Sequence, residues 1–240
     1  MTEKVFYQDS YQKTHSSEIK SLRDDGLILT STIFYPLGGG QPGDTGRLTI
    51  NGKTYPVIDT CYDEDRESII HFIDEGDLGD PGELKVGDAV DMEINWQRRH
   101  RLMRMHSSLH LVCSLIKAQA TGGSVGEYES RLDFDLQDEV VDKEKLNAAL
   151  NELVSRGVPL SIGSISDAEL EQNPELVRTM SVQPPRGQGS VRTITIEGVD
   201  YQPCGGTHVK NTAEIGELLV SKVKNKGKQN KRITITLVNP

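Results

Sequence analysis

Short apolar runs separated by turn-forming residues fill the chain up to about Asn95. Runs of this length, bounded by Gly, Pro, Asn and Asp, are typical of β-strands, and no helical period accompanies them. Many short strands with glycine-rich turns predict a small β-barrel or sandwich. The expected strands are Val5–Tyr7, Leu27–Ile33, Leu48–Ile50, Tyr55–Thr60, Ser68–Ile73 and Ala89–Ile94.

Two dipeptides in this region predict tight turns. Asn51-Gly52 lies between two apolar runs, and Asn-Gly favours a two-residue hairpin loop because both loop positions need positive φ. Asp25-Gly26 is a weaker signal of the same kind. We therefore expect antiparallel hairpins at both places.

A helical pattern begins at Asn95, which is a candidate N-cap. Over 96–120 a stripe of apolar residues with spacings of 3, 4, 3 and 4 predicts an amphipathic helix. Thr121-Gly122-Gly123 is the candidate stop. The stripe consists of Leu102, Met105, Leu109, Val112 and Ile116.

The rest of the chain mixes strand and helix patterns. We predict an α+β fold in which a β-barrel-like domain with a glycine-rich loop, residues 1–95, precedes an α+β domain, residues 96–240. The further strands expected are Ser130–Leu136, Pro159–Ile165, Val191–Glu197, Ile215–Val223 and Ile233–Val238, with helices at Asp142–Ser155 and Asp167–Glu171.

Charge and cysteine content narrow the function classes. With 27 basic and 36 acidic residues the formal net charge is −9, so any contact with nucleic acid must come from local basic clusters. Three widely separated cysteines do not make a disulfide framework. No signal-peptide pattern and no apolar run of roughly 18 residues is present. We expect a cytoplasmic protein with no membrane partner, and the sequence leaves its oligomeric state open.

Two pairs of residues have the spacing of metal ligands: His106-Ser-Ser-Leu-His110 and Cys204-Gly-Gly-Thr-His208. Helix positions four apart share a face, so both imidazoles of the first pair can point at one ion. The glycines of the second pair allow a tight loop that brings both of its ends to the same ion. Imidazole and thiolate donors together suit zinc best, so we predict a zinc site built from these four residues.

The ligand set leaves two questions open. Cys113 follows His110 by three positions and could compete as a ligand, although its apolar neighbours favour a buried structural thiol. Four protein ligands would close the site, whereas catalysis usually needs an open position. Either one of the four is loose or does not contact the metal directly, or zinc only orients the substrate or water while another group acts. The other histidines have no partner at ligand spacing and are expected to be packing or surface residues: His15, His71 and His100.

These two pairs, about a hundred residues apart, closely resemble the editing domain of alanyl-tRNA synthetases. They resemble equally the free-standing alanyl-tRNA editing proteins of the AlaX type. Each motif is weak alone, but their order is specific, and the threonyl-tRNA synthetase editing domain is a more distant match. Three further segments fit the family: Leu37-Gly-Gly-Gly-Gln-Pro-Gly-Asp-Thr-Gly46, Ser130-Arg-Leu-Asp-Phe-Asp135 and Glu214-Ile-Gly216.

The resemblance implies a hydrolase that edits in trans, deacylating mischarged tRNA(Ala) by zinc-assisted ester hydrolysis. Seryl-tRNA(Ala) is the expected substrate and glycyl-tRNA(Ala) a further one. No catalytic side chain is assigned, and a zinc-bound water is the expected nucleophile. The alternative is a non-catalytic, zinc-stabilised module that binds tRNA or a synthetase. A metalloprotease is disfavoured because the helical pair lacks the Glu of H-E-x-x-H.

Substrate candidates lie near the motifs. Three consecutive glycines, Gly38 to Gly40, cost chain entropy on folding, and close approach to a ligand or to RNA would justify that cost. The segment lacks the GxxxxGK[ST] pattern of a nucleotide-binding site. To discriminate a seryl from an alanyl substrate, the site needs a group that hydrogen-bonds the serine hydroxyl. Where the family pattern leads us to expect a Gln, this chain has Thr121-Gly-Gly-Ser-Val-Gly-Glu127. The candidates are Gly38, Gly39, Gly40, Gln41, Thr45, Thr121 and Ser124.

Two basic clusters could contact the RNA. One lies at the start of the predicted helix that carries His106 and His110. The other is a run without acidic residues near the C-terminus, which also contains Lys231 and Arg232. A charge run can equally be a solvated face. The residues predicted to contact RNA are Arg98, Arg99, Arg101 and Arg104, and Lys222, Lys224, Lys226 and Lys228.

Overall fold

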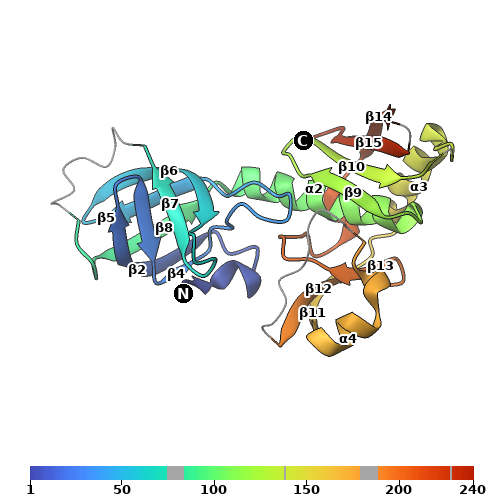
Figure 1. The fold of residues 1–240 in the computed structure, drawn as a ribbon. Coiled ribbons are helices and arrows are strands. Elements are labelled where there is room, and N and C mark those ends of the chain that lie inside the picture. Colours follow the sequence, from blue (N-terminus) through green and yellow to red (C-terminus); the bar gives the residue numbers. More distant parts are fainter. Residues whose placement is uncertain (75–83, 138, 179–188, 228) are drawn as a thin grey trace. The chain divides into compact units, whose positions relative to one another are not determined.

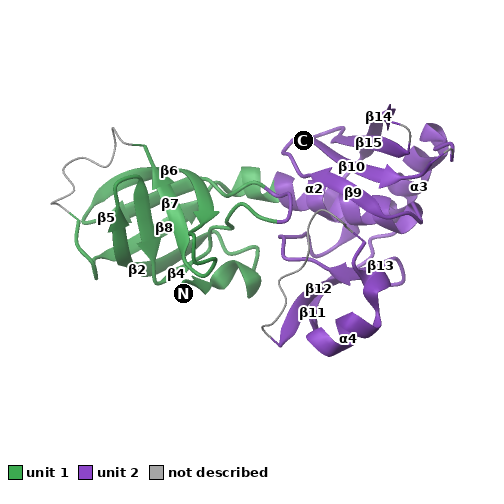
Figure 2. Ribbon diagram, in the orientation of Figure 1, with its two compact units in different colours: residues 1–38, 42–100 green, residues 39–41, 101–240 purple. Residues whose placement is uncertain are grey.

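The computed structural model describes residues 1–74, 84–137, 139–178, 189–227 and 229–240 (Figure 1). By the contacts among its residues, the chain forms two compact units (Figure 2). Unit 1 contains residues 1–38 and 42–100, and unit 2 contains residues 39–41 and 101–240. The chain thus passes from unit 1 to unit 2 inside helix α2 (Trp96–Leu115) rather than before it.

Unit 1 is a closed antiparallel barrel with the strand order β2-β3-β7-β6-β5-β8, one of the two architectures that the short strands predict, although β2 was not among the expected strands. Alternate residues of β5 and β8 point into its apolar core, which gives each strand one buried face. The barrel strands are β2 (Thr14–Arg23), β3 (Gly26–Leu29), β5 (Gly46–Ile50), β6 (Lys53–Tyr62), β7 (Ile69–Ile73) and β8 (Ala89–Ile94). A short parallel pair is formed by β1 (Glu3–Lys4) and β4 (Ser31–Thr32).

The predicted strand Val5–Tyr7 is wrong, because this segment forms a 3-10 helix. Its turn is closed by backbone hydrogen bonds from Gln8 and Asp9 to the Val5 carbonyl. Phe6 is fully buried and packs edge-on against the rings of Tyr7 and Tyr35. The apolar run therefore reflects burial and not strand pairing.

Both predicted hairpins are present, with one difference in the turn. Asn51 and Gly52 have φ of +52° and +79° and join β5 to β6. In the β2–β3 hairpin Gly26 lies within the strand, and its ladder partner across the loop is Arg23. A Cβ on Gly26 would lie 2.2 Å from the carbonyl oxygen of His71, so the glycine serves close strand packing.

Unit 2 mixes two antiparallel sheets with helices, which agrees with the expected combination of α and β structure. The four-stranded sheet has the order β14-β15-β10-β9 and the three-stranded sheet the order β11-β12-β13. The strands are β9 (Ala120–Ser124), β10 (Glu129–Asp135), β11 (Leu160–Ser166), β12 (Ser190–Ile196), β13 (Asp200–Pro203), β14 (Leu218–Lys226) and β15 (Asn230–Leu237). The further helices are α3 (Lys143–Ser155) and α4 (Asp167–Gln172), with 3-10 turns at Pro174–Leu176 and Thr212–Ile215.

Helix α2 begins where the sequence predicts, since the Asn95 side chain accepts the backbone N–H of Arg98 at 3.2 Å. Its predicted character as an amphipathic helix is wrong, because the described side chains from Leu102 to Cys113 are almost all buried, around the whole circumference. This helix is therefore an interior element. None of the described helices has both the length and the apolar character needed to cross a membrane.

The predicted end of this helix at Thr121-Gly122-Gly123 is also wrong. The helix stops at Leu115, and the Arg178 guanidinium donates to the carbonyls of Cys113 and Ile116 at its end. The two glycines lie instead in β9, where a Cβ on Gly123 would come within 2.9 Å of a Leu132 methyl group. Close pairing with β10 explains the small residues.

Candidate metal centre

Helix α2 carries the first ligand pair. His106 and His110 are 6% and 4% exposed, and their ring centroids are 5.7 Å apart. The spacing of four places both rings on one side of the helix. The two serines between them are fully buried, so the helix packs closely around this pair.

Strand β13 and the loop after it carry the second pair, Cys204 and His208. The Arg192 guanidinium on β12 donates to the carbonyls of Cys204 and Gly206, at 2.7 Å and 3.0 Å, and so fixes the loop. A Cβ on Gly206 would lie 2.0 Å from the His106 ring. Only glycine therefore lets this loop approach the first pair so closely.

The two pairs converge on one point. The ligand atoms of the four residues all lie within 4.8 Å of one another, and among the described residues no other group of three or more His, Cys, Asp or Glu meets that standard. The Cys204 Sγ lies 3.5 Å from Nε2 of His106 and 3.2 Å from Nε2 of His208. The donor atoms thus face each other as they would around a shared ion.

The Nδ1 atom of each imidazole, on the side of the ring away from the other ligands, is hydrogen-bonded. Every Nδ1 of the three rings has a hydrogen-bonding partner, which leaves Nε2 for a metal and fixes the orientation of each ring. The partners are Gln41 Oε1 for His106 at 2.9 Å, Asp200 Oδ2 for His110 at 2.8 Å and Ser107 Oγ for His208 at 3.2 Å.

The cluster favours a thiolate at its centre. Burial alone would raise the pKa of Cys204, but the nearby His106 and His208 hold it well below its usual value. Burial alone would lower the pKa of His110, but Asp200 and Cys204 raise it to about 10. Burial, with His106 next in importance, lowers the pKa of His208 well below its usual value. A thiolate among imidazoles is the donor set of a borderline-soft metal ion.

Cys113 is not a member of this group. Its side chain is 4% exposed, and burial raises the pKa of its thiol to about 12, so it stays protonated. This is the buried structural thiol that its apolar neighbours predict. The four residues chosen by spacing are the ones that the fold brings together.

The glycine-rich segment contributes directly to this centre. Gln41 is fully buried, and besides contacting His106 it exchanges two hydrogen bonds with Thr207, at 2.8 Å and 3.1 Å. Gly39 and Gly40 have φ of +59° and +80°, which only glycine adopts readily. The Gly40 carbonyl accepts the N–H of Val125 at 2.8 Å, beside β9.

Of the other predicted substrate-binding residues, only some lie near the glycine-rich segment. Ser124 lies next to the glycine-rich segment, with its Cα 3.9 Å from the position of a Cβ on Gly40. The Thr121 hydroxyl donates to the Asp133 carbonyl at 3.1 Å, within the sheet. Gly38 and Thr45 belong to unit 1, and the contacts of the chain do not group them with the metal ligands.

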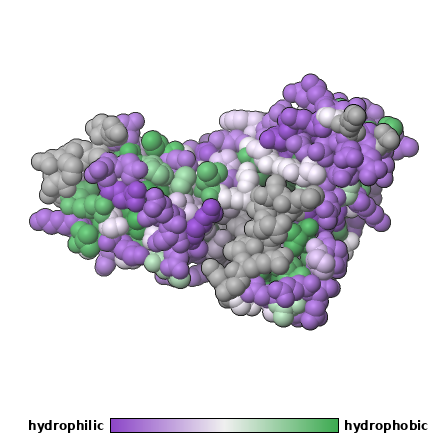
Figure 3. All heavy atoms as spheres, in the orientation of Figure 1, coloured by the Kyte–Doolittle hydropathy of each residue, from purple (hydrophilic) through white to green (hydrophobic). Residues whose placement is uncertain are grey.

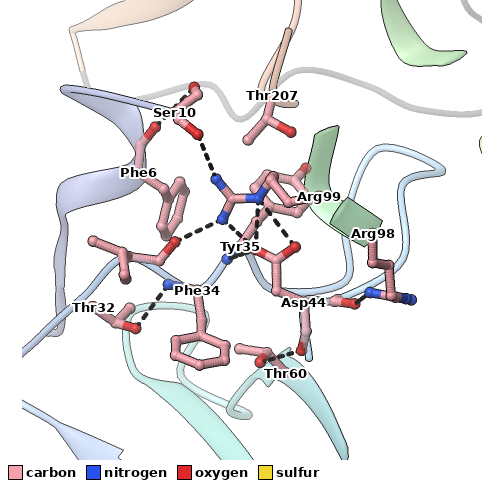
Figure 4. Close-up of polar contacts among 12 residues, drawn as sticks. Phe6, Ser10, Thr32, Phe34, Tyr35, Asp44, Thr60, Arg98, Arg99 and Thr207 are labelled. Carbon is pink, nitrogen blue, oxygen red and sulfur yellow. Dashed lines mark hydrogen bonds and ion pairs between the residues drawn. The ribbon is translucent and has the colours of Figure 1, made fainter. Parts of the chain in front are cut away.

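The arginine cluster is largely occupied by contacts within the protein. Arg99 is fully buried in a network with Asp44 (Figure 4), so the prediction that it contacts RNA is wrong. Arg98 donates to the Gly43 carbonyl. Arg101 pairs with the Glu127 carboxylate at 2.9 Å, and Arg104 donates to the Ile215 and Asn239 carbonyls at 2.8 Å each.

The lysine run lies on β14. Lys222, Lys224 and Lys226 are exposed at alternate positions, so they share one face of the strand. Lys222 lies 3.6 Å from Glu129, an exposed pair of small energetic weight. The surface over β14 and β15 is hydrophilic (Figure 3). Lys228 lies outside the described residues.

Sequence reasoning missed the groups behind the ligands, above all Asp200 and Ser107. A usable signal was present for Asp200, because it stands two and four positions before Gln202 and Cys204. On a strand this spacing places all three residues on one face.

Comparisons with known proteins converge on one family. A class II (A) tRNA synthetase family model matches residues 2–98, and a model described as the threonyl and alanyl tRNA synthetase second additional domain matches residues 191–234. The chain is 36% identical over 249 residues to the alanyl-tRNA editing protein AlaX-M of Methanosarcina barkeri, covering all of both chains. It is 36% identical to AlaX-M of Saccharolobus solfataricus, covering 99% of each. It is 33% identical to an alanine–tRNA ligase of Saccharolobus islandicus, covering 93% of this chain and 25% of the ligase.

Proposed function

Because the chain belongs to the alanyl-tRNA editing proteins, which deacylate mischarged tRNA, we propose that it hydrolyses seryl-tRNA(Ala), and to a lesser extent glycyl-tRNA(Ala), in trans. Family membership confirms the resemblance inferred from the motifs and makes an aminoacylated tRNA the substrate. The observation that carries the proposal is the convergence of three buried histidines and the partly buried Cys204 in a chain that matches editing proteins along its whole length.

The four converging residues are the ligands of a zinc ion in this proposal: His106, His110, Cys204 and His208. Bound zinc would supply Lewis-acid chemistry suited to ester hydrolysis, by polarising a carbonyl group or lowering the pKa of water. The protein's part is to hold each imidazole by its Nδ1 and to keep the thiol ionised. Burial of the three histidines limits access by bulk water.

Discrimination between serine and alanine is assigned to the segment beside Gly40. Ser124 lies there, whereas the Thr121 hydroxyl is committed as a donor to the Asp133 carbonyl. A group that hydrogen-bonds the substrate hydroxyl is left without its partner when alanine is bound, which disfavours alanyl-tRNA. Ser124 is therefore the preferred candidate for this contact.

Binding of the tRNA backbone is assigned to the β14 face. Lys222, Lys224 and Lys226 present three cations in a row to solvent. Such a row can neutralise phosphates even in a protein whose net charge is −9.

A deacylation assay with tRNA(Ala) charged with serine, glycine or alanine tests the proposal. The seryl ester is expected to be hydrolysed far faster than the alanyl ester, and the glycyl ester, which also lacks the hydroxyl, more slowly than the seryl ester. Cys204→Ala should abolish the activity, and Cys113→Ala, which removes a thiol outside the ligand group, should retain it. Equal rates on all three esters would overturn the assignment. Stoichiometric zinc without hydrolysis of any ester would indicate the non-catalytic module instead.

A further inference from the structure

Strand β13 presents a second functional residue on the face that leads to Cys204. Asp200 and Gln202 are buried at 9% and 5% exposure, while Tyr201 between them is 40% exposed. The hairpin with β12 fixes the strand, since Asp200 is the ladder partner of Ile196. Strand β13 thus leads directly into Cys204 and carries, two and four positions earlier, two buried polar side chains.

Asp200 and Gln202 meet the imidazole of His110. The Asp200 Oδ2 lies 2.8 Å from its Nδ1, and the Gln202 Nε2 lies 2.7 Å from that oxygen and 2.9 Å from Nδ1. An amide nitrogen only donates and a carboxylate oxygen only accepts. If Nδ1 carried a lone pair, it would face the carboxylate with no proton between them. Both the ring and the amide therefore donate to Asp200, and the Nδ1–Nε2 approach is one between two donors.

This arrangement selects one tautomer of the ring. In a ring that binds the ion, the proton is on Nδ1 and the lone pair is on Nε2, the atom that turns toward the other ligands. The other two imidazoles are supported by neutral groups, the Gln41 amide and the Ser107 hydroxyl. His110 is the ligand held by a carboxylate, and a carboxylate accepts more strongly than either neutral group.

We propose that Asp200 is a positioning residue of the metal centre: its carboxylate, held in place by Gln202, accepts the Nδ1–H of His110 and presents Nε2 of that ring to the ion. This rests on the proposed zinc site. Removing the carboxylate frees the ring to rotate and to change tautomer, so the ion loses a well-aligned ligand while all four ligand residues remain in the chain. Groups of this kind typically contribute about 10–100-fold to metal affinity.

Zinc affinity measured by competition with a chromophoric chelator tests this role. Asp200→Ala is expected to bind zinc about 10–100-fold more weakly than the wild type. Asp200→Asn, which keeps an acceptor oxygen of the same size, should lie between the two. Tyr201→Ala is the matched control, because it alters the opposite face of the same strand and should leave the affinity unchanged.

Cobalt substitution supplies a second readout, which a general loss of packing would not reproduce. The visible absorption of the Co²⁺ form should change in Asp200→Ala, because one imidazole is no longer aligned, and should match the wild type in Tyr201→Ala. Wild-type zinc affinity and an unchanged spectrum in both Asp200 variants would overturn the role of Asp200, as would an equal loss in Tyr201→Ala. A wild-type protein that binds no zinc would instead overturn the proposed metal site itself.

Discussion

Arg99 and Asp44 form an ion pair in the interior of unit 1, where both side chains are almost fully excluded from solvent (Figure 4). The Arg99 Nε lies 3.0 Å and 2.9 Å from the two carboxylate oxygens. The rest of the guanidinium donates to the carbonyls of Ser10 and Ile33, and Asp44 also accepts the N–H of Tyr35. The pair thus ties the first turn of α2 to three other segments of the same unit.

Removal of one partner should destabilise unit 1 severely. Arg99→Ala leaves the Asp44 carboxylate buried and unpaired, and the expected loss is about 3–5 kcal/mol in the free energy of unfolding. Arg47→Ala is the control, because its pair with Glu93 is exposed and should contribute at most about 1 kcal/mol. Urea titration of both variants measures the difference, and equal losses would contradict this account of Arg99.

Loss of a ligand should release zinc without unfolding the chain. Metal analysis of Cys204→Ala and His110→Ala is expected to show strong loss of zinc, because each removes one donor from the converging set. Cys113→Ala should keep its zinc, since that thiol is buried and protonated. Full zinc occupancy in both ligand variants would show that the ion is held elsewhere.

The β14 lysines should control tRNA affinity and its dependence on salt. Replacing Lys222, Lys224 and Lys226 with alanine is expected to reduce the slope of log affinity against log salt by up to about one unit for each phosphate that is no longer neutralised. The Michaelis constant should rise more than the rate at saturation falls, because these lysines would hold the substrate equally in the ground state and the transition state.

Zinc content should not change in this triple variant, because none of the three lysines belongs to the ligand cluster. Replacement of the exposed Lys145 on α3 serves as the control for a loss of charge elsewhere in unit 2. An unaltered affinity and slope in the triple variant would show that the lysine run is only a solvated face.

A buried histidine should make unit 1 sensitive to acid. Burial lowers the pKa of His71 from 6.5 to about 4, against the opposing effect of its hydrogen bond with the Leu27 carbonyl. Because the unfolded chain takes up the proton first, the contribution of His71 to stability is constant above pH 6.5 and is lost as the pH falls toward 4. The expected loss is roughly 3 kcal/mol, since each pKa unit is about 1.4 kcal/mol.

The same measurement on His71→Gln isolates this contribution. The variant is expected to lack the part of the pH dependence between 6.5 and 4 that His71 supplies, whatever its absolute stability. Curves of equal slope for the wild type and His71→Gln would contradict the argument.

Local signals in the sequence were sufficient for most strands of the barrel and for the start of α2, but not for β2. The turn at Asn51-Gly52 and the cap at Asn95 each depend on contacts within a few residues. The end of α2 was not predictable in this way, because Arg178, far along the chain, satisfies its last carbonyls. The apolar stripe on α2 also gave a wrong prediction, because between Leu102 and Cys113 most of the polar positions beside the stripe are buried as well.

In the candidate metal site, too, local features were predictable from the sequence and long-range contacts were not. Ligand spacing within each pair is a local property, and it identified the four residues that converge. The groups that hold His106 and His110 come from 65 and 90 positions away, and only the fold brings them into contact. For Arg99 the local sequence was misleading. Four arginines lie within seven positions and look alike in sequence, but only Arg99 is fully buried.

The assignment of Gly39–Gln41 to unit 2, and of the first turn of α2 to unit 1, means that the two units are interleaved along the chain. A gene fragment that starts at residue 96 would encode unit 2 without the glutamine that contacts His106. The same cut would deprive the barrel of the arginine that neutralises Asp44. A single crossover therefore cannot transfer either unit in complete form. Recombination is expected to exchange unit 1 and unit 2 only together.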